Sequence, residues 1–409
     1  MSNRLLASAL SVAALVLASP AAFAQMVTIQ NHVITNPQGG TVTFPKIEVT
    51  NTNLSREQVV KIFTPDTTKE ERTALLKSMK ADRFAIPTIQ IQGPKARGAF
   101  NNFVATDINA GKLGKATLDS FDVAGTDKSD KPISMKSGAI AIENGDFSTV
   151  ATAIATGDTA GLQPRVGVFK WTGFDLSIVE DGPKERTGPI RIAVGSIDMT
   201  NVFDGELFKS GVFAVKNLVI EPGKGSKLSR DLSPFGYDKL DLGMTMTSAY
   251  DAAKKALTVD DWTISGASAG ALTLKAAMGS LEKGAFAPDQ NAQLAALLGA
   301  DISRLEIKFA NAGLFEKAVA FVAQQQKKQP DALRKEWGAM AGQFLPAVLG
   351  GDPSALAIAG EAQKFVAEPK SLTLVATGKS GPVKLIDLAS IKDPAGFLQK
   401  VKVEAAANR

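Results

Sequence analysis

From Val27 to Leu281 most of the chain is a succession of short runs in which apolar and polar residues alternate. Gly, Asp, Asn, Lys and Pro separate these runs. Alternation along a run is typical of a strand with one apolar and one polar face, and turn residues between runs favour antiparallel neighbours. The pattern therefore predicts a meander of antiparallel strands.

The clearest alternation covers residues 240–247, where large apolar residues are interleaved with Asp, Gly and Thr. Residues 250–255 predict a turn and residues 256–265 the returning strand, with Asp260-Asp261 at a bulge or bend. This apolar face must be covered, because each large aliphatic side chain left in water forfeits about 1.5 to 3 kcal/mol. The residues that we expect on it are Leu240, Leu242, Met244, Met246, Trp262 and Ile264.

Helical patterns interrupt the strands at two places. Ser55-x-x-Gln58 is a capping box that predicts a short helix, and a second helix is expected from Asp66 to Lys80 before Pro87 returns the chain to strands. After about Pro288 the period becomes about 3.6 residues. Helices are predicted there at 291–298, 313–327, 331–349 and 354–366, and strands at 304–309, 371–375 and 401–403.

These elements predict an α+β fold that is mainly β, built on a large antiparallel meander sheet, curved or groove-like, with C-terminal helices packing on it. Residues 25–290 would form the β-rich body, with a short helical insertion near 55–80, and residues 291–409 would add helices and returning strands to the same domain. The sequence leaves two alternatives for what covers the apolar face. Either the sheet curls into a groove with room for acyl chains, or helices shield it with Leu314, Val319, Phe321, Val322, Leu333, Trp337, Met340 and Phe344.

Residues 1–24 have the form of a cleavable secretory signal. Arg4 precedes an apolar run at 5–17, and Ala22-Phe23-Ala24 is an A-x-A cleavage site. The apolar run is shorter than the roughly 18 residues that a spanning helix needs. We therefore expect the mature chain to begin at Gln25 and to work in a bacterial periplasm. Because the chain has no Cys, lipoprotein acylation and disulfides are excluded.

Charge narrows the choice of partners. The formal net charge is +5, and no cluster of Lys and Arg is interleaved with aromatic residues, so we expect no nucleic-acid partner. With 44% apolar but only 6% aromatic residues, the core is expected to be mostly aliphatic.

The sequence contains no catalytic motif whose neighbouring elements and partner residues fit the chemistry. His32 is the single histidine and Cys is absent, which removes most triads and any histidine-rich zinc site. We expect His32 to be a solvated or strand-surface residue. Gly266-x-Ser268-x-Gly270 matches a nucleophile pattern, but a strand follows it and no histidine lies downstream, so a flexible turn is predicted.

Acidic pairs offer the remaining chemistry. Glu180-Asp181, Asp260-Asp261 and Asp127-x-x-Asp130 could ligate a hard cation or act as acid and base, but all lie at predicted turns, where acidic residues are ordinary. We expect no catalytic residue, no cofactor and no metal site.

Three C-terminal segments carry a resemblance to a known group. They are Tyr250-Asp-Ala-Ala-Lys-Lys-Ala-Leu-Thr-Val, Leu305-Glu-Ile-Lys-Phe-Ala-Asn-Ala-Gly-Leu-Phe-Glu-Lys, and residues 371–407. In these segments the chain resembles the AsmA-like and YdgA-like bacterial periplasmic proteins. The resemblance implies an amphipathic β-rich body associated with lipid handling or envelope assembly. Those families usually keep an N-terminal membrane anchor, whereas Ala22-Phe23-Ala24 predicts release.

The leading hypothesis is a non-enzymatic periplasmic envelope protein that binds or shuttles a lipid or another apolar ligand in a β-groove, with peripheral membrane contact as a further option. The alternative is a structural or interaction module of the envelope with a self-covered sheet and no small ligand. An enzyme that uses carboxylates is the third reading. A groove would leave a row of apolar side chains that contact no helix, whereas a closed core would not.

Overall fold

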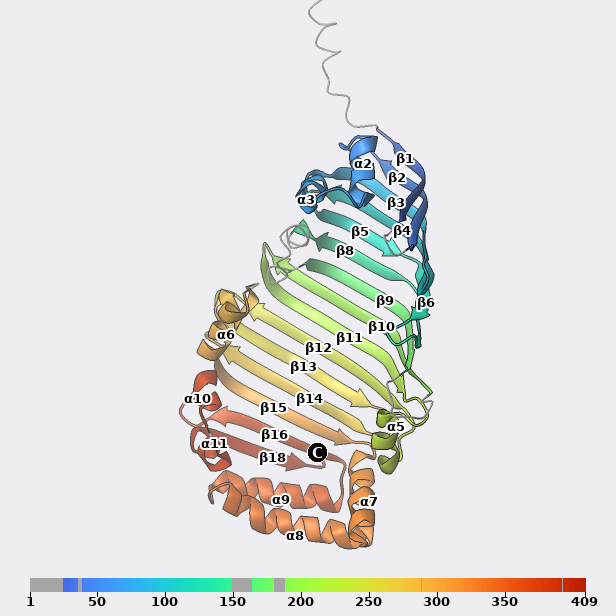
Figure 1. The fold of residues 1–409 in the computed structure, drawn as a ribbon. Coiled ribbons are helices and arrows are strands. Elements are labelled where there is room, and N and C mark those ends of the chain that lie inside the picture. Colours follow the sequence, from blue (N-terminus) through green and yellow to red (C-terminus); the bar gives the residue numbers. More distant parts are fainter. Residues whose placement is uncertain (1–24, 36–38, 149–163, 180–187, 288, 392) are drawn as a thin grey trace, which may run out of the picture.

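A single 18-stranded antiparallel sheet runs through the protein. The computed structural model describes residues 25–35, 39–148, 164–179, 188–287, 289–391 and 393–409. The fold is mainly β, and the predicted class is confirmed. Figure 1 shows the strands stacked in chain order, from β1 at one end to β18 at the other.

The N-terminal strands form a regular meander that divides once. Its first four strands pair in sequence: β1 (Val27–Thr35), β2 (Thr41–Thr50), β3 (Lys80–Gln92) and β4 (Ala96–Asn109). Two pairs of short strands then lie end to end between β4 and β9 (Arg165–Val179). One pair joins β5 (Lys112–Leu118) to β8 (Ile140–Asp146), and the other joins β6 (Ser120–Thr126) to β7 (Pro132–Ser137).

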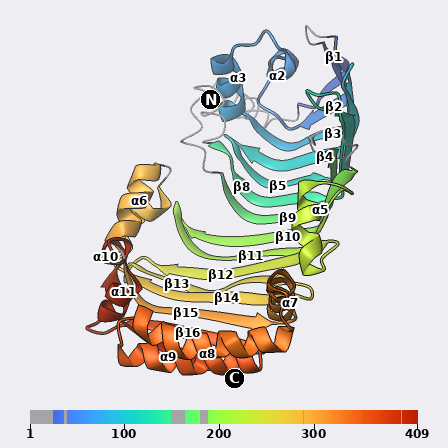
Figure 2. The same ribbon diagram turned by 60° about the horizontal axis from the view of Figure 1, so that its bottom comes forward.

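From β9 onward undivided strands again pair in order. They are β10 (Pro189–Asp204), β11 (Leu207–Glu221), β12 (Leu240–Asp251), β13 (Ala256–Gly266), β14 (Gly270–Gly279), β15 (Asp301–Asn311), β16 (Ser371–Gly378) and β18 (Val401–Ala407). The two-residue β17 (Val383–Lys384) pairs with the start of β15. Figure 2 shows that the whole sheet is curved.

The register puts apolar residues opposite apolar residues. Met244 faces Ile264, and Ile264 in turn faces Leu272 on the next strand. Because directly opposed residues of an antiparallel pair point to the same side, these pairings give the sheet one continuous apolar face. The predicted bulge at Asp260-Asp261 is present, since the register of β12 and β13 shifts opposite Thr247 and Ser248.

Two helices cover the apolar face at the N-terminal end. They are α2 (Arg56–Phe63), which begins with the predicted capping box at Ser55, and α3 (Lys69–Ser78), which is capped by Thr68. Val59 of α2 is fully buried with Ile47 and Val49 of β2 in the largest apolar cluster of the described residues. This end of the sheet therefore has a conventional two-layer core.

The C-terminal end has its own helical cover. There α9 (Pro353–Ala367) packs on β18 and β16, and α11 (Pro394–Lys400) closes a small core around Ala355, Leu398 and Val403. The remaining helices are α7 (Leu314–Gln326) and α8 (Pro330–Val348) beyond the sheet, with α5 (Lys227–Leu232), η1 (Ser233–Phe235), η2 (Lys283–Phe286), α6 (Gln290–Gly299) and α10 (Leu385–Ala389) along its margins.

Several local expectations need correction. The second early helix begins at Lys69 and not at Asp66, because Thr68 supplies its N-cap. Strand β3 begins at Lys80, so Pro87 lies inside it, at a place where pairing with β2 is interrupted between Ala85 and Gln90 and a missing N–H costs little. The short α5, α10 and α11 were not predicted, since fewer than two turns show no clear period.

The N-terminal core generates a direct test of the two-layer arrangement. Val59→Ala is expected to lower the free energy of unfolding by about 1–3 kcal/mol, because it leaves a cavity at a site with no exposed surface. Urea denaturation of both proteins measures the difference. Val33→Ala on β1 is the matched control, since Val33 is 50% exposed and should change stability by about 0.5 kcal/mol or less. Equal effects of the two substitutions would contradict the packing of α2 on the sheet.

Candidate functional site

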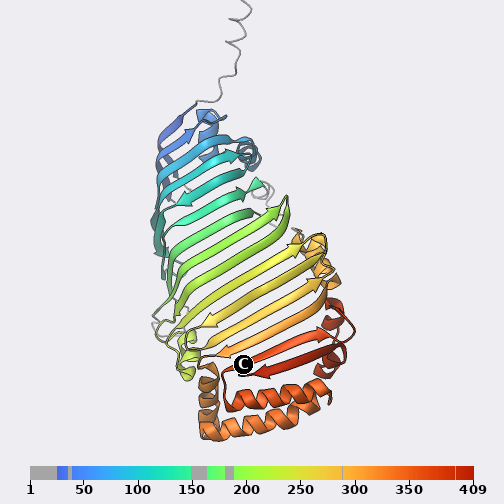
Figure 3. The same ribbon diagram turned by 180° about the vertical axis from the view of Figure 1, so that it is seen from behind.

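In the described part of the chain, no second layer lies on the middle of the apolar face, on strands β9 to β14. Among the described residues no helix crosses these strands, as Figures 1 and 3 show from opposite sides. Tyr250 is the only large apolar side chain on β9 to β14 that is buried. The floor of the curved sheet is therefore open to solvent between two covered ends.

All six residues predicted for an apolar face lie on this floor. Met244 pairs with Ile264 and Met246 with Trp262, which places the two strands' apolar residues side by side. Trp262 is 41% exposed and Ile264 43%, and Leu272 on the next strand is 47% exposed. Leu240, Leu242, Met244 and Met246 are half-buried. The alternative in which C-terminal helices shield the face does not hold for Met244, Met246, Trp262 and Ile264: Met340 and Phe344 of α8 are exposed, and Val319 and Leu333 are buried between α7 and α8.

The open floor has the dimensions of lipid tails. With strands about 4.8 Å apart, the six strands from β9 to β14 span about 24 Å along the groove. Four alternating apolar residues on one strand cover about 20 Å across it. The acyl chains of one bilayer leaflet fill a layer of about 15 Å, half the hydrocarbon thickness. Extended chains would therefore fit on this floor in either direction.

Aromatic residues line the N-terminal part of the floor on β9. The rings of Trp171 and Phe174 lie 4.9 Å apart between centroids, and Phe169 packs edge-on against Trp171 at 6.5 Å. The indole Nε1 of Trp171 donates to Ser137 Oγ at 2.6 Å, which fixes the ring orientation. This cluster gives the floor a rigid apolar section.

One margin of the groove holds an apolar cavity of about 250 Å³ beneath α5, η1 and α7. Leu240 and Leu242 contribute its floor, and Phe235, Tyr237 and Leu314 its wall. Lys317 Nζ lies 3.4 Å from the centre of the Tyr237 ring, a cation–π contact that holds α7 against this wall. The two leucines therefore touch a helical margin, whereas Met244 and Met246 lie further out on the open floor.

The opposite margin holds a wider hollow of about 1130 Å³. Phe203, Phe208 and Phe286 give it an apolar side, and Arg165 and Glu206 stand at its polar side. Sequence reasoning missed these residues, because the hollow combines the β10–β11 turn with η2 and the start of β9. The one available signal was the pair of aromatic residues on either side of Asp204-Gly205.

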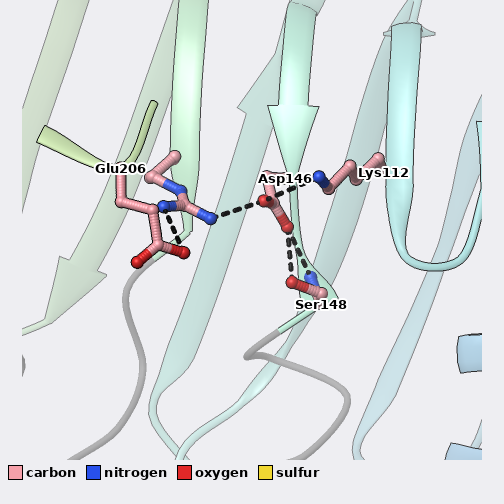
Figure 4. Close-up of polar contacts among 5 residues, drawn as sticks. Lys112, Asp146, Ser148 and Glu206 are labelled. Carbon is pink, nitrogen blue, oxygen red and sulfur yellow. Dashed lines mark hydrogen bonds and ion pairs between the residues drawn. The ribbon is translucent and has the colours of Figure 1, made fainter. Parts of the chain in front are cut away.

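Ionised groups fasten this second margin (Figure 4). Asp146 accepts hydrogen bonds from Arg165 Nη2 at 2.7 Å and from Ser148 Oγ at 2.6 Å, while Arg165 Nη1 reaches Glu206 at 3.1 Å. Burial alone raises the pKa of Asp146, but the hydrogen bonds from Ser148 and Arg165 outweigh it and leave the pKa below its ordinary value. The hydrogen bonds that Arg165 donates to Asp146 and Glu206 raise the pKa of Arg165. The network ties the ends of β8 and β9 to the β10–β11 turn.

A separate hollow of about 550 Å³ lies mostly on the polar face of the sheet over Gly243. Thr245, Thr263 and Ser265 line it, and Asp261 accepts hydrogen bonds from the two threonines at 2.6 Å each. The polar side chains on this surface thus find their hydrogen-bond partners within the sheet.

The other residues singled out from the sequence have local structural roles. His32 is a half-buried residue of β1: its ring packs between Phe44 and Phe63 at centroid distances of 6.0 and 6.3 Å, because this part of β1 lies next to α2. Ser268 and Gly270 form the tight β13–β14 turn, where Gly270 has a φ of 130° and a Cβ would lie 2.1 Å from the carbonyl oxygen of Ala310. The predicted turn at the serine motif is confirmed.

The acidic pair Asp127-x-x-Asp130 stabilises a turn. Asp127 accepts backbone hydrogen bonds from Ser129 and Lys131, and Asp130 pairs with Lys95 at 2.7 Å. Glu180-Asp181 lies outside the described residues. Within the part of the chain that the structure describes, no group of three or more His, Cys, Asp or Glu side chains is arranged to hold a metal ion.

The Asp146 network leads to a pH-dependent stability prediction. Because folding lowers the pKa of Asp146, its contribution is present at neutral pH and is lost as the pH falls through the folded pKa. Asp146→Asn is expected to lower the free energy of unfolding by about 1–2 kcal/mol at pH 7, and the difference should shrink in acid. Urea denaturation across pH 3–7 measures it. Asp122→Asn breaks only an exposed pair with Lys136 and should have little effect at any pH. A pH-independent deficit at Asp146 would contradict the assigned role.

Comparison with known proteins gives a match over the C-terminal part of the chain. The model of a family described as an uncharacterized protein matches residues 263–408. That region runs from within β13 to the end of β18 and includes the C-terminal helical cover. No curated protein matches the chain.

Proposed function

We propose that this chain is a non-enzymatic binding protein that carries a lipid or another apolar ligand on the open floor between β9 and β14. The observation that carries the proposal is the exposed row of Trp262, Ile264 and Leu272, which the register places beside Met244 and Met246 on the same side of the sheet. Exposed apolar patches of this extent are typical of binding surfaces. A ligand would recover the burial that the sheet lacks.

The two margins fit an amphipathic ligand. Apolar tails would lie on the aliphatic and aromatic floor, while the hollow beside Arg165 and Glu206 offers polar groups at the edge. The resemblance of the C-terminal segments to AsmA-like and YdgA-like envelope proteins adds to this proposal. A structural module with a self-covered sheet is less well supported, because it requires a cover over Trp262 and Ile264.

The native cargo tests the proposal. The full chain is purified from its native envelope without added lipid, and an organic extract is analysed by mass spectrometry. We expect about one or more lipid molecules per protein, since the floor accommodates extended chains. A stable monomer that carries no extractable apolar compound would overturn the proposal.

A matched pair of variants locates the site. Ile264→Glu adds a charge to the floor and is expected to lower the lipid recovered per protein by about tenfold, because a carboxylate there must be desolvated by bound tails. Ser265→Glu adds the same charge to the same strand on the polar face and should leave the lipid content unchanged. Equal lipid content in both variants would place the ligand elsewhere.

We also propose export to the periplasm through cleavage after Ala24. Residues 1–24 lie outside the described residues. Expression in a bacterial host, followed by fractionation and intact-mass measurement, should yield a periplasmic chain that begins at Gln25. Ala24→Arg disturbs the small-residue site and is expected to retain the leader. A cytoplasmic chain that keeps residues 1–24 without any substitution would contradict export.

A further inference from the structure

The helical hairpin of α8 and α9 presents an apolar stripe on its outer side. Within it α9 packs on β18, and α8 packs on α9 as the outermost element of this end. Gly338 and Gly342 face α9, since Gln363 Nε2 donates to the Gly338 carbonyl at 3.2 Å and lies against Gly342. Residues two positions further along a helix lie about 200° around its axis. The outer stripe consists of Met340, Phe344 and Val348, which are 45%, 61% and 54% exposed.

The hairpin is also depleted of charge. Between residues 337 and 360 the single charged residue is Asp352, and Lys379 pairs with it at 2.7 Å. Leu356, in the first turn of α9, is 62% exposed and extends the apolar surface toward the hairpin connection. A helix at the surface of a soluble protein normally turns charged and polar residues outward. This hairpin turns large apolar residues outward instead.

The C-terminal segment that contains the hairpin carries a net positive charge. Residues 314–409 contain 13 Lys and Arg against 9 Asp and Glu, whereas residues 25–313 contain 32 of each. The whole excess of positive charge after residue 24 therefore lies in the segment that contains the hairpin. Such an end attracts an anionic surface.

We propose that the α8–α9 hairpin docks on an anionic membrane surface, with Met340, Phe344 and Val348 entering the boundary between headgroups and acyl chains. An exposed apolar stripe in a segment of net positive charge is the pattern of an interfacial helix. No described helix combines the length and hydropathy needed to cross a membrane. A second copy of the chain is the less favourable occupant, because the two basic ends would repel each other.

Docking there would bring the groove close to the bilayer. The cover formed by α9 lies on β16 and β18, whose apolar face continues the floor that begins at β9. Figure 2 shows the hairpin across this end of the curved sheet. The docking surface lies outside the groove, so that membrane binding can be measured with or without bound cargo.

Vesicle binding tests it. The full chain beginning at Gln25 is sedimented with vesicles of phosphatidylcholine that contain about one quarter phosphatidylglycerol, and with vesicles of phosphatidylcholine alone. We expect binding to the anionic vesicles that weakens markedly as ionic strength rises to about 0.5 M. The double variant Phe344→Glu with Val348→Glu should bind at least about tenfold more weakly.

Two controls make the outcome specific. Val202→Glu with Val212→Glu adds the same charge at residues that are 47% and 52% exposed on the sheet, and should bind vesicles about tenfold better than the hairpin variant. Ile264→Glu should keep vesicle binding while losing cargo, which separates failure of this inference from failure of the groove proposal. Absence of binding by the unsubstituted chain, or equal binding by the hairpin variant, would overturn docking. A concentration-dependent dimer that the hairpin substitutions abolish would assign the stripe to self-association instead.

Discussion

The structure depends on the strict alternation of side chains across one very wide sheet. Every strand sends half of its residues to each face, so a meander with this register produces an apolar face as long as the sheet itself. Burying that face requires a second layer of equal extent. Among the residues that the structure describes, such a layer is present only at the two ends, where α2 and α3 cover the first strands and α9 and α11 cover the last.

The uncovered middle of the sheet costs the protein part of its burial free energy. Each large apolar side chain that stays half in water gives up part of the roughly 1.5–3 kcal/mol that full burial would contribute. Curvature reduces the loss, since neighbouring side chains on a concave face approach one another, and residues such as Met244 and Met246 are half-buried without any helix above them. Trp262 and Ile264 are left more exposed, and this exposure is the observation on which the proposal of an apolar ligand rests.

The polar interactions are arranged so that the floor can stay apolar. The Asp146–Arg165–Glu206 network fastens strand ends and a turn at one margin, and the cation–π contact of Lys317 with Tyr237 fastens a helix at the other. Both act at the edges, where ionised groups keep contact with water. The C-terminal segment extends this division to the whole molecule: the body is balanced in charge, while residues 314–409 combine excess positive charge with an outward apolar stripe.

The sequence by itself determined the mainly β class, the meander, the four long C-terminal helices to within a few residues, and the six residues of the apolar face. These features follow from local periodicity and from caps such as Ser55, which need no distant partner. The tertiary structure decided what covers that face. The apolar residues of α7 and α8 are compatible with packing on the sheet, on each other, or on an outside surface, and periodicity cannot distinguish these partners. In the structure Val319 of α7 and Leu333 of α8 are buried against each other, while Phe344 remains exposed. The hollow at Phe203 and Phe286 forms because the β10–β11 turn and η2, which are far apart in the sequence, meet at one margin of the sheet.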